Sequence, residues 1–200
     1  MSLINISTLP SGSLLGLWHI RESIEELLVL YPSLSFLYES IKSHGSKSRI
    51  IEKLAVHALL IEMTGQRDII VGHNSDGRPF VDGWNISISH TKGFASVILS
   101  RSNEVAVDIE YISDRVSKMV SKFVREDEQA DNLIQQLITW CTKETVYKYY
   151  SSQHLDFFDI RLQPFAPSNS GIIVVDNLRG NTSISVNYVV TTDYILTYID

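Results

Sequence analysis

The chain has 200 residues, of which 44% are hydrophobic and 20% are charged, with 10 Gly and 5 Pro. These values are typical of globular proteins and exclude collagen-like, coiled-coil and disordered classes. A total of 17 Lys and Arg against 23 Asp and Glu gives a formal charge of -6. This disfavours a general binder of nucleic acid or anionic membranes, because such proteins need a basic surface.

The chain contains one cysteine, Cys141, and therefore no intrachain disulfide. Residues 1–20 have neither the basic cluster nor the apolar stretch of a secretory signal, and no window approaches the ~18 apolar residues of a membrane span. We expect a cytoplasmic protein that does not bind a membrane.

The first hundred residues predict helices followed by strands. Residues 14–20 are strand-like, and apolar residues then recur at helical spacing over residues 24–31 and 34–41. Ser46 or Ser48 is a candidate N-cap of a long helix that runs through Met63 and ends at Gly65. Five short strands separated by turn residues are predicted next, at residues 68–72, 78–81, 85–90, 94–100 and 105–110.

Helical spacing then returns, followed again by strands. An apolar stripe consists of Val116, Met119, Val120 and Phe123, and a long helix is predicted at about residues 131–150. The remaining strands are predicted at residues 172–175, 183–190 and 194–199. This order indicates an α+β fold of two similar halves, a pseudo-dimer, with residues 1–102 and 103–200 as its units.

Two acidic residues share one face of the predicted strand at 105–110. Because side chains alternate along a strand, Val105, Val107 and Ile109 enter a core while Asp108 and Glu110 share the other face. A hard divalent cation such as Mg²⁺ would neutralise the two carboxylates. The alternative is a solvated strand face, which is the commoner environment of acidic residues.

The long helix carries a second candidate cluster. Its members are Trp140, Lys143, Glu144, Tyr147 and Lys148, which fall on one side at helical spacing. Glu144 offers a carboxylate and the two lysines offer cations, a mixture suited to a metal-bound diphosphate. The alternative is an ordinary amphipathic helix with an exposed Glu144–Lys148 pair.

Two further features could bind an anion. Ser89 and His90 end a predicted strand, where a hydroxyl and an imidazole are available for a phosphate oxygen. A basic run of Lys42, Lys47, Arg49 and Lys53 surrounds the start of the long N-terminal helix. A structural histidine and a solvated helix end are the respective alternatives.

Taken in this order, the motifs resemble the 4'-phosphopantetheinyl transferase superfamily, in its larger two-halved type that includes the surfactin-synthetase activator. The family signature is a Gly-(Ile/Val)-Asp strand followed by Trp/Phe-x-x-Lys-Glu-x-x-x-Lys, here Ala106 to Asp108 and Trp140 to Lys148. The matching minor elements are Ser89-His90, Arg78-Pro79 and the segment from Phe123 to Glu128. The sequence departs from the family at Ala106, usually Gly, whose methyl group is expected to point toward the site.

The resemblance implies a role for each candidate residue. Asp108, Glu110 and Glu144 would hold Mg²⁺ against the diphosphate of coenzyme A. Ser89, His90, Lys143 and Lys148 would contact the diphosphate or stabilise the leaving group, and Arg49 and Arg78 would meet the 3'-phosphate and adenine. Glu144 or Glu128 would take the proton of the attacking serine.

The resemblance also implies the fold of this family and its reaction, in which 4'-phosphopantetheine passes from coenzyme A to a serine of an apo acyl or peptidyl carrier protein. The product 3',5'-ADP is released. The length, close to that of two short units fused, predicts a monomer with one site at the seam. The alternatives are a non-catalytic relative that binds coenzyme A or the carrier, and another Mg²⁺-dependent phosphate or nucleotide enzyme.

Overall fold

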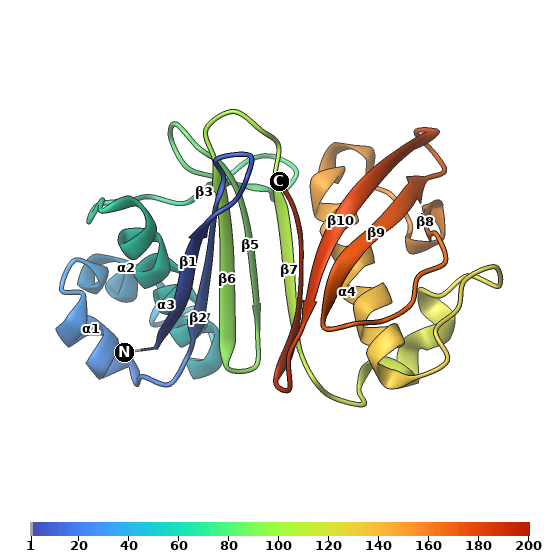
Figure 1. Ribbon diagram of the computed structural model, residues 1–200. Helices are drawn as coiled ribbons and strands as arrows, with labels where there is room; N and C mark the ends of the chain where they lie inside the picture. Colours follow the sequence, from blue (N-terminus) through green and yellow to red (C-terminus); the bar gives the residue numbers. More distant parts are fainter. Residues whose placement is uncertain (1) are drawn as a thin grey trace.

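The computed structural model describes residues 2–200 and contains two main antiparallel sheets. The sheets lie next to each other in the middle of the molecule, with helices on the outer sides (Figure 1). The N-terminal sheet has the strand order β1-β2-β6-β5, and the C-terminal sheet has the order β7-β11-β10-β9-β8. The chain passes from one sheet to the other between Ser100 and Ala106.

The N-terminal part combines four strands, three helices and a small hairpin. Its sheet consists of β1 (Leu3–Thr8), β2 (Leu14–His19), β5 (Asn85–Thr91) and β6 (Phe94–Ser100). The helices are α1 (Ile24–Leu30), α2 (Leu34–Ile41) and α3 (Lys47–Thr64), and the hairpin is β3 (Gly72–His73) with β4 (Pro79–Phe80). The predicted ends of α3 are confirmed: the Ser46 side chain accepts a hydrogen bond from the Arg49 N–H, and Gly65 adopts the left-handed conformation with φ of 71°.

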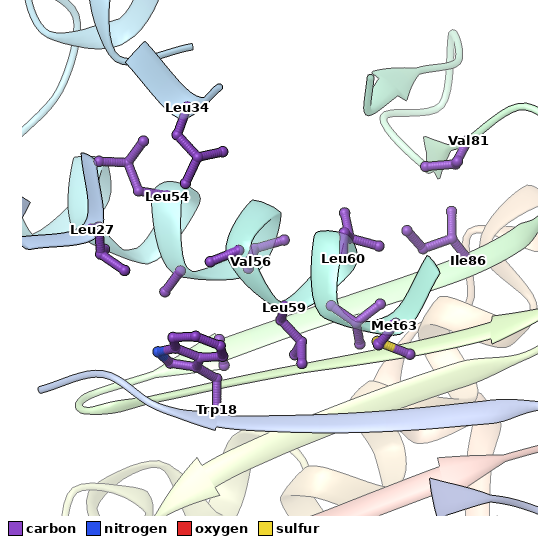
Figure 2. Close-up of a cluster of buried hydrophobic side chains, with 14 of the residues drawn as sticks. Trp18, Leu27, Leu34, Leu54, Val56, Leu59, Leu60, Met63, Val81 and Ile86 are labelled. Carbon is purple, nitrogen blue, oxygen red and sulfur yellow. The ribbon is translucent and has the colours of Figure 1, made fainter. Parts of the chain in front are cut away.

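The core of this part lies between α3 and the sheet. Leu54, Leu59 and Leu60 of α3 are fully buried, and Trp18 of β2 is equally buried beneath them (Figure 2). Apolar residues occupy most positions on the inward side of α3, so the helix is fixed against β2 and β6 by burial of hydrophobic surface. The other side of α3 is thereby held facing solvent and the seam.

The C-terminal part is built around one long helix. Its strands are β7 (Ala106–Tyr111), β8 (Ile160–Leu162), β9 (Ser170–Asn177), β10 (Thr182–Val190) and β11 (Tyr194–Ile199). The helices are α4 (Leu133–Tyr149) and the 3₁₀ turns η1 (Val116–Lys122), η2 (Ser151–Gln153) and η3 (Phe157–Asp159). The Asn132 side chain caps α4 by accepting a hydrogen bond from the Gln135 N–H, and the buried side of α4 packs on the sheet.

A third apolar cluster joins the two sheets. It contains Leu17, Phe94 and Ile98 from the N-terminal sheet and Val105, Val107, Ile109 and Leu196 from the C-terminal part. The alternation predicted for β7 is therefore confirmed, because Val107 and Ile109 enter this cluster and Asp108 faces the other way, toward α4. As a result, β5 and β7, each the edge strand of its sheet, lie beside one another.

Several predicted strand boundaries were wrong. Strand β1 was not predicted, and in the structure its pairing with β2 has a register shift between Leu3 and Asn5. Strand β8 was missed because it is only 3 residues long. The strand predicted at residues 68–72 reduces to Gly72 and His73. Ile70 is 81% exposed there, and β3 pairs with β4 alone, so no sheet supports a longer strand.

The mixed α+β class agrees with the structure, whereas the similarity of the two halves stays a prediction. Within residues 2–200, no helix has the length and apolar character needed to cross a membrane.

Candidate active site

Asp108 is the central residue of the candidate site. It is buried on β7, where its Oδ1 atom accepts hydrogen bonds from Ser89 Oγ of β5 and from Lys148 Nζ of α4, each at 2.7 Å. Its second oxygen, Oδ2, is also buried and has no hydrogen-bond partner. A buried carboxylate oxygen without a partner costs free energy, and such an atom calls for a ligand to complete it.

Glu110 lies two residues further along the same face of β7. Its Oε1 accepts a hydrogen bond from Trp140 Nε1 at 2.9 Å, and its Oε2 accepts one from Thr91 Oγ1 at 3.2 Å. Burial raises the pKa of Glu110, and the neighbouring Asp108 carboxylate raises it further. Trp140 thus anchors the carboxylate from α4, as well as packing against the Phe123 ring.

Glu144 of α4 adds a third carboxylate to the two of β7. Burial raises the pKa of Glu144 to about 7, and the Asp108 charge acts in the same direction, while Lys148 opposes the shift. A carboxyl group with a pKa near neutrality is suited to exchange a proton with a substrate at physiological pH.

Lys148, one helical turn after Glu144, links the two sheets. In addition to Asp108, its Nζ donates hydrogen bonds to the Val107 carbonyl of β7 at 3.1 Å and to the Ile88 carbonyl of β5 at 3.4 Å. The structure therefore does not contain the alternative, an exposed Glu144–Lys148 pair, because the Lys148 ammonium group is directed at Asp108.

These residues line one cavity of about 690 Å³, which we call the main cavity. Its walls include Asp108, Glu110, Glu144 and Lys148 from the C-terminal part and Ser89 and His90 from β5. His90 Nδ1 lies 3.3 Å from Glu52 Oε2 of α3, which orients the imidazole at the rim. Sequence reasoning named all six of these residues, although they come from β5, β7 and α4.

A second cavity, of about 670 Å³, opens on the other side of His90 and Glu110, which line both spaces. Its charged walls include Glu52, Lys92 and Arg115, and its apolar walls include Val116, Met119 and Leu137. His90 and Glu110 therefore stand between two hollows that are each large enough for part of a ligand.

Lys143 and Glu128 are not part of either cavity, which corrects the roles predicted for them. Lys143 Nζ donates to Glu128 Oε2 at 2.8 Å, and the two side chains are only 0% and 2% exposed. The remaining Glu128 oxygen accepts the Leu162 N–H at 2.7 Å. Because consecutive helical residues point about 100° apart, Lys143 turns away from the site that Glu144 faces.

Arg78 and Arg49 also lie outside the cavity walls. Arg78 forms an ion pair with Glu104, and Arg49 borders a separate hollow of about 190 Å³ that it shares with Lys53. Direct contact of either arginine with a ligand in the main cavity is not supported by these positions. Lys53 lines both hollows and is the cation that connects them.

Two ionisable cavity residues were not named as site residues by sequence reasoning, His57 of α3 and His73 of β3, and Lys53 was named only as part of the basic run. Arg49, Lys53 and His57 are spaced four residues apart and so share one face of α3, a signal that was available in the sequence. His57 Nδ1 lies 2.9 Å from the Lys53 carbonyl, and burial lowers the pKa of His57.

Ala106 was expected to narrow the site, and this expectation was wrong. Its side chain is fully buried in the apolar cluster between α4 and the C-terminal sheet. It lines neither cavity, because β7 is already covered by α4 at this end of the strand.

Asp108, Glu110 and Glu144 offer the oxygen ligands that a hard cation prefers, although their carboxyl groups do not form a complete coordination shell in the structure. Among residues 2–200, no three His, Cys, Asp or Glu side chains lie close enough to hold a metal ion together. The partnerless Asp108 Oδ2 and the carboxyl groups of Glu144 and Glu110, whose pKa values are raised mainly by burial and further by Asp108, nevertheless offer oxygen ligands that a divalent cation would favour in their charged form.

A comparison with protein-family models gives one match. Residues 104–199 match the family model of the 4'-phosphopantetheinyl transferase superfamily. This segment contains β7 and α4, and therefore Asp108, Glu110, Glu144 and Lys148. The match supports a role in phosphopantetheine transfer, whereas a comparison with curated proteins found no match.

Proposed function

We propose that the protein is a 4'-phosphopantetheinyl transferase that moves 4'-phosphopantetheine from coenzyme A to a serine of an apo acyl or peptidyl carrier protein. The observation that carries the proposal is one cavity in which three carboxylates and Lys148 of the family-matching segment face Ser89 and His90 of the other sheet. Since a single chain supplies all these residues, a monomer would suffice.

The diphosphate of coenzyme A is the natural ligand for the polar wall of the main cavity. Lys148 approaches from α4 and offsets negative charge on the phosphates, His90 approaches from β5 and offers a hydrogen bond, and Lys53 extends the basic side toward the 3'-phosphate. Arg49, which shares a hollow with Lys53, adds to this potential from a greater distance.

Mg²⁺ would be held by Asp108, Glu110 and Glu144, with the free Asp108 Oδ2 as the first oxygen available. The ion would supply charge neutralisation for the diphosphate in the transition state. Because Lys148 occupies the other Asp108 oxygen, the same carboxylate is shared between the ion and a cation of the chain.

The proton of the acceptor serine is assigned to Glu144. Without a bound cation its pKa is about 7, and a bound Mg²⁺ would lower this pKa and keep the carboxylate in its basic form at neutral pH. Glu128, the other candidate, is sealed in an ion pair. As the serine Oγ–P bond forms, the bond from phosphorus to the bridging oxygen of the diphosphate breaks, and 3',5'-ADP leaves with the electron pair.

The two cavities suggest where donor and acceptor lie. We place coenzyme A in the cavity lined by Lys53 and Glu144, and the carrier serine on the side lined by Val116 and Met119. His90 and Glu110, common to both, then stand where the two substrates meet. With Ala106 in the core, the reason for favouring a non-catalytic relative is lost.

Mass spectrometry of a panel of apo carriers, incubated with the protein, coenzyme A and Mg²⁺, tests the proposal. We expect a mass gain of one phosphopantetheinyl group on at least one carrier and none with Glu144→Gln. Binding of coenzyme A without transfer to any carrier in the panel would favour the non-catalytic alternative.

A further inference from the structure

The junction between the two sheets is made by side chains in place of a main-chain ladder. Strands β5 and β7 lie side by side at the seam (Figure 1), yet they are not hydrogen-bonded neighbours in either sheet. Edge strands leave N–H groups unpaired, and such groups require partners when they are buried. The partners here are hydroxyl groups.

Three hydroxyl residues of β5 meet β7 at alternate positions. The Val107 N–H donates to Ser87 Oγ at 3.1 Å, and the Ile109 N–H donates to Ser89 Oγ at 3.2 Å. Thr91 Oγ1 donates to Glu110 Oε2 at 3.2 Å. We call Ser87, Ser89 and Thr91 the hydroxyl row.

The bonds of Ser89 determine which Asp108 oxygen is available. A hydroxyl group has one hydrogen, and that of Ser89 is donated to Asp108 Oδ1, while a lone pair accepts the Ile109 N–H. Ser89 is buried, and in this arrangement it has no hydrogen left for a phosphate oxygen. Its bonds hold Asp108 with Oδ1 toward β5 and leave Oδ2 partnerless.

We propose that the hydroxyl row is a positioning element, which fixes the edge of β7 against β5 and aims the Asp108 and Glu110 carboxylates for a divalent cation. Ser89 is then a positioning residue that acts through Asp108, in place of the ligand contact that the family resemblance implied. The inference rests on the proposed function only in its choice of the cation and of the reaction.

The chain offers a matched control in Ser96 of β6. Ser96 is the cross-strand neighbour of Ser89, is fully buried, and donates to the Gly16 carbonyl within the N-terminal sheet. Ser96→Ala therefore removes a buried serine hydroxyl next to Ser89 that bonds within the N-terminal sheet and leaves the hydrogen bonds of the hydroxyl row to β7 in place.

The test compares Ser89→Ala with Ser96→Ala by calorimetric titration with Mg²⁺ or Mn²⁺, by Tm, and by kcat and KM for coenzyme A. We expect Ser89→Ala to weaken cation affinity by about 10-fold, the usual effect of removing a partner of a metal ligand, with KM nearly unchanged. Ser96→Ala is expected to leave cation affinity and KM at wild-type values.

A second measurement does not require transferase activity. Ser89→Ala and Asp108→Ala should be non-additive in Tm, because each removes the hydrogen bond from Ser89 Oγ to Asp108 Oδ1, whereas Ser96→Ala and Asp108→Ala should add. Equal loss of cation affinity in both serine variants, or a raised coenzyme A KM with unchanged cation affinity in Ser89→Ala, would overturn the proposal. Failure of the proposed function alone would abolish transfer in the wild type but leave the Tm coupling.

Discussion

Two lysine–carboxylate pairs extend from the same helix, and they differ in how completely they are satisfied. In the pair of Lys143 and Glu128, both Glu128 oxygens accept hydrogen bonds, and neither side chain is reached by solvent. In the pair of Lys148 and Asp108, the lysine is 28% exposed and one Asp108 oxygen has no partner. The first pair is a fully hydrogen-bonded structural unit, whereas the second keeps one carboxylate oxygen without a partner, as expected of a binding site.

The largest difference should be in stability. Lys143→Met leaves Glu128 charged and buried, so we expect it to lower the free energy of unfolding by about 3–5 kcal/mol, measured by urea denaturation. Lys148→Met should cost less than half as much, because Asp108 keeps the hydrogen bond from Ser89 and Lys148 itself is partly exposed. Comparable losses in the two variants would remove the distinction, and Lys143→Met with Glu128→Leu should recover most of the stability.

The second difference should be in activity. We expect Asp108→Ala to reduce transfer to a carrier by about 10²–10³-fold while the protein stays folded, since the partnerless oxygen contributes to charge stabilisation and little to stability. Circular dichroism and the mass-spectrometric assay check the two parts. Asp176→Ala, which removes the partner of Arg161 on β9, serves as the control and should retain full activity.

The third prediction concerns the pH dependence of stability caused by Glu144, the carboxyl group beside the pair of Lys148 and Asp108. The folded-state pKa of Glu144 is about 7 against its ordinary 4.5, so between these values the folded protein holds a proton that the unfolded chain has lost. The free energy of unfolding therefore falls as pH rises through this window. Glu144→Gln does not titrate.

We expect Glu144→Gln to raise Tm by a few degrees at about pH 8 and to leave it nearly unchanged at about pH 4, with no divalent cation added. Thermal melts across this pH range provide the measurement. A Tm difference that is independent of pH would show that its surroundings do not raise the pKa of Glu144.

The smallest effect is expected at the basic rim. Lys53→Ala should raise the KM for coenzyme A by about fivefold, and Arg49→Ala by less, because only Lys53 lines the main cavity. Dephospho-coenzyme A as substrate should reduce the effect of Lys53→Ala. If Arg49→Ala had the larger effect, the 3'-phosphate would lie in the small hollow of Arg49, as the resemblance implied.

Residues whose role depends on local pattern were predictable from sequence. Asp108 and Glu110 share a strand face by simple alternation, and Ser46 and Gly65 mark the ends of α3 through capping preferences that act over a few residues. Glu144 and Lys148 were placed together by the helical repeat. For such residues, chain-local geometry is enough.

Residues whose role depends on long-range packing were not predictable. Lys143 sits beside Glu144 in sequence, and only the fold brings Glu128 and Leu162 to close around it. Ala106 shares the face of Asp108, but α4 covers one and leaves the other open to the cavity. The partner that each side chain meets is decided by elements far away in the chain, which spacing alone does not encode.

The meeting of β5 and β7 has a consequence for any attempt to divide the molecule. A fragment of residues 104–199, the segment that matches the family, would expose the Val107 and Ile109 N–H groups and the apolar side chains of the cluster between the sheets. An open edge beside an apolar surface favours self-association. The fragment would then be expected to aggregate or to pair with its own copies. In the whole chain, the N-terminal sheet prevents this by covering the edge of β7 and the apolar surface.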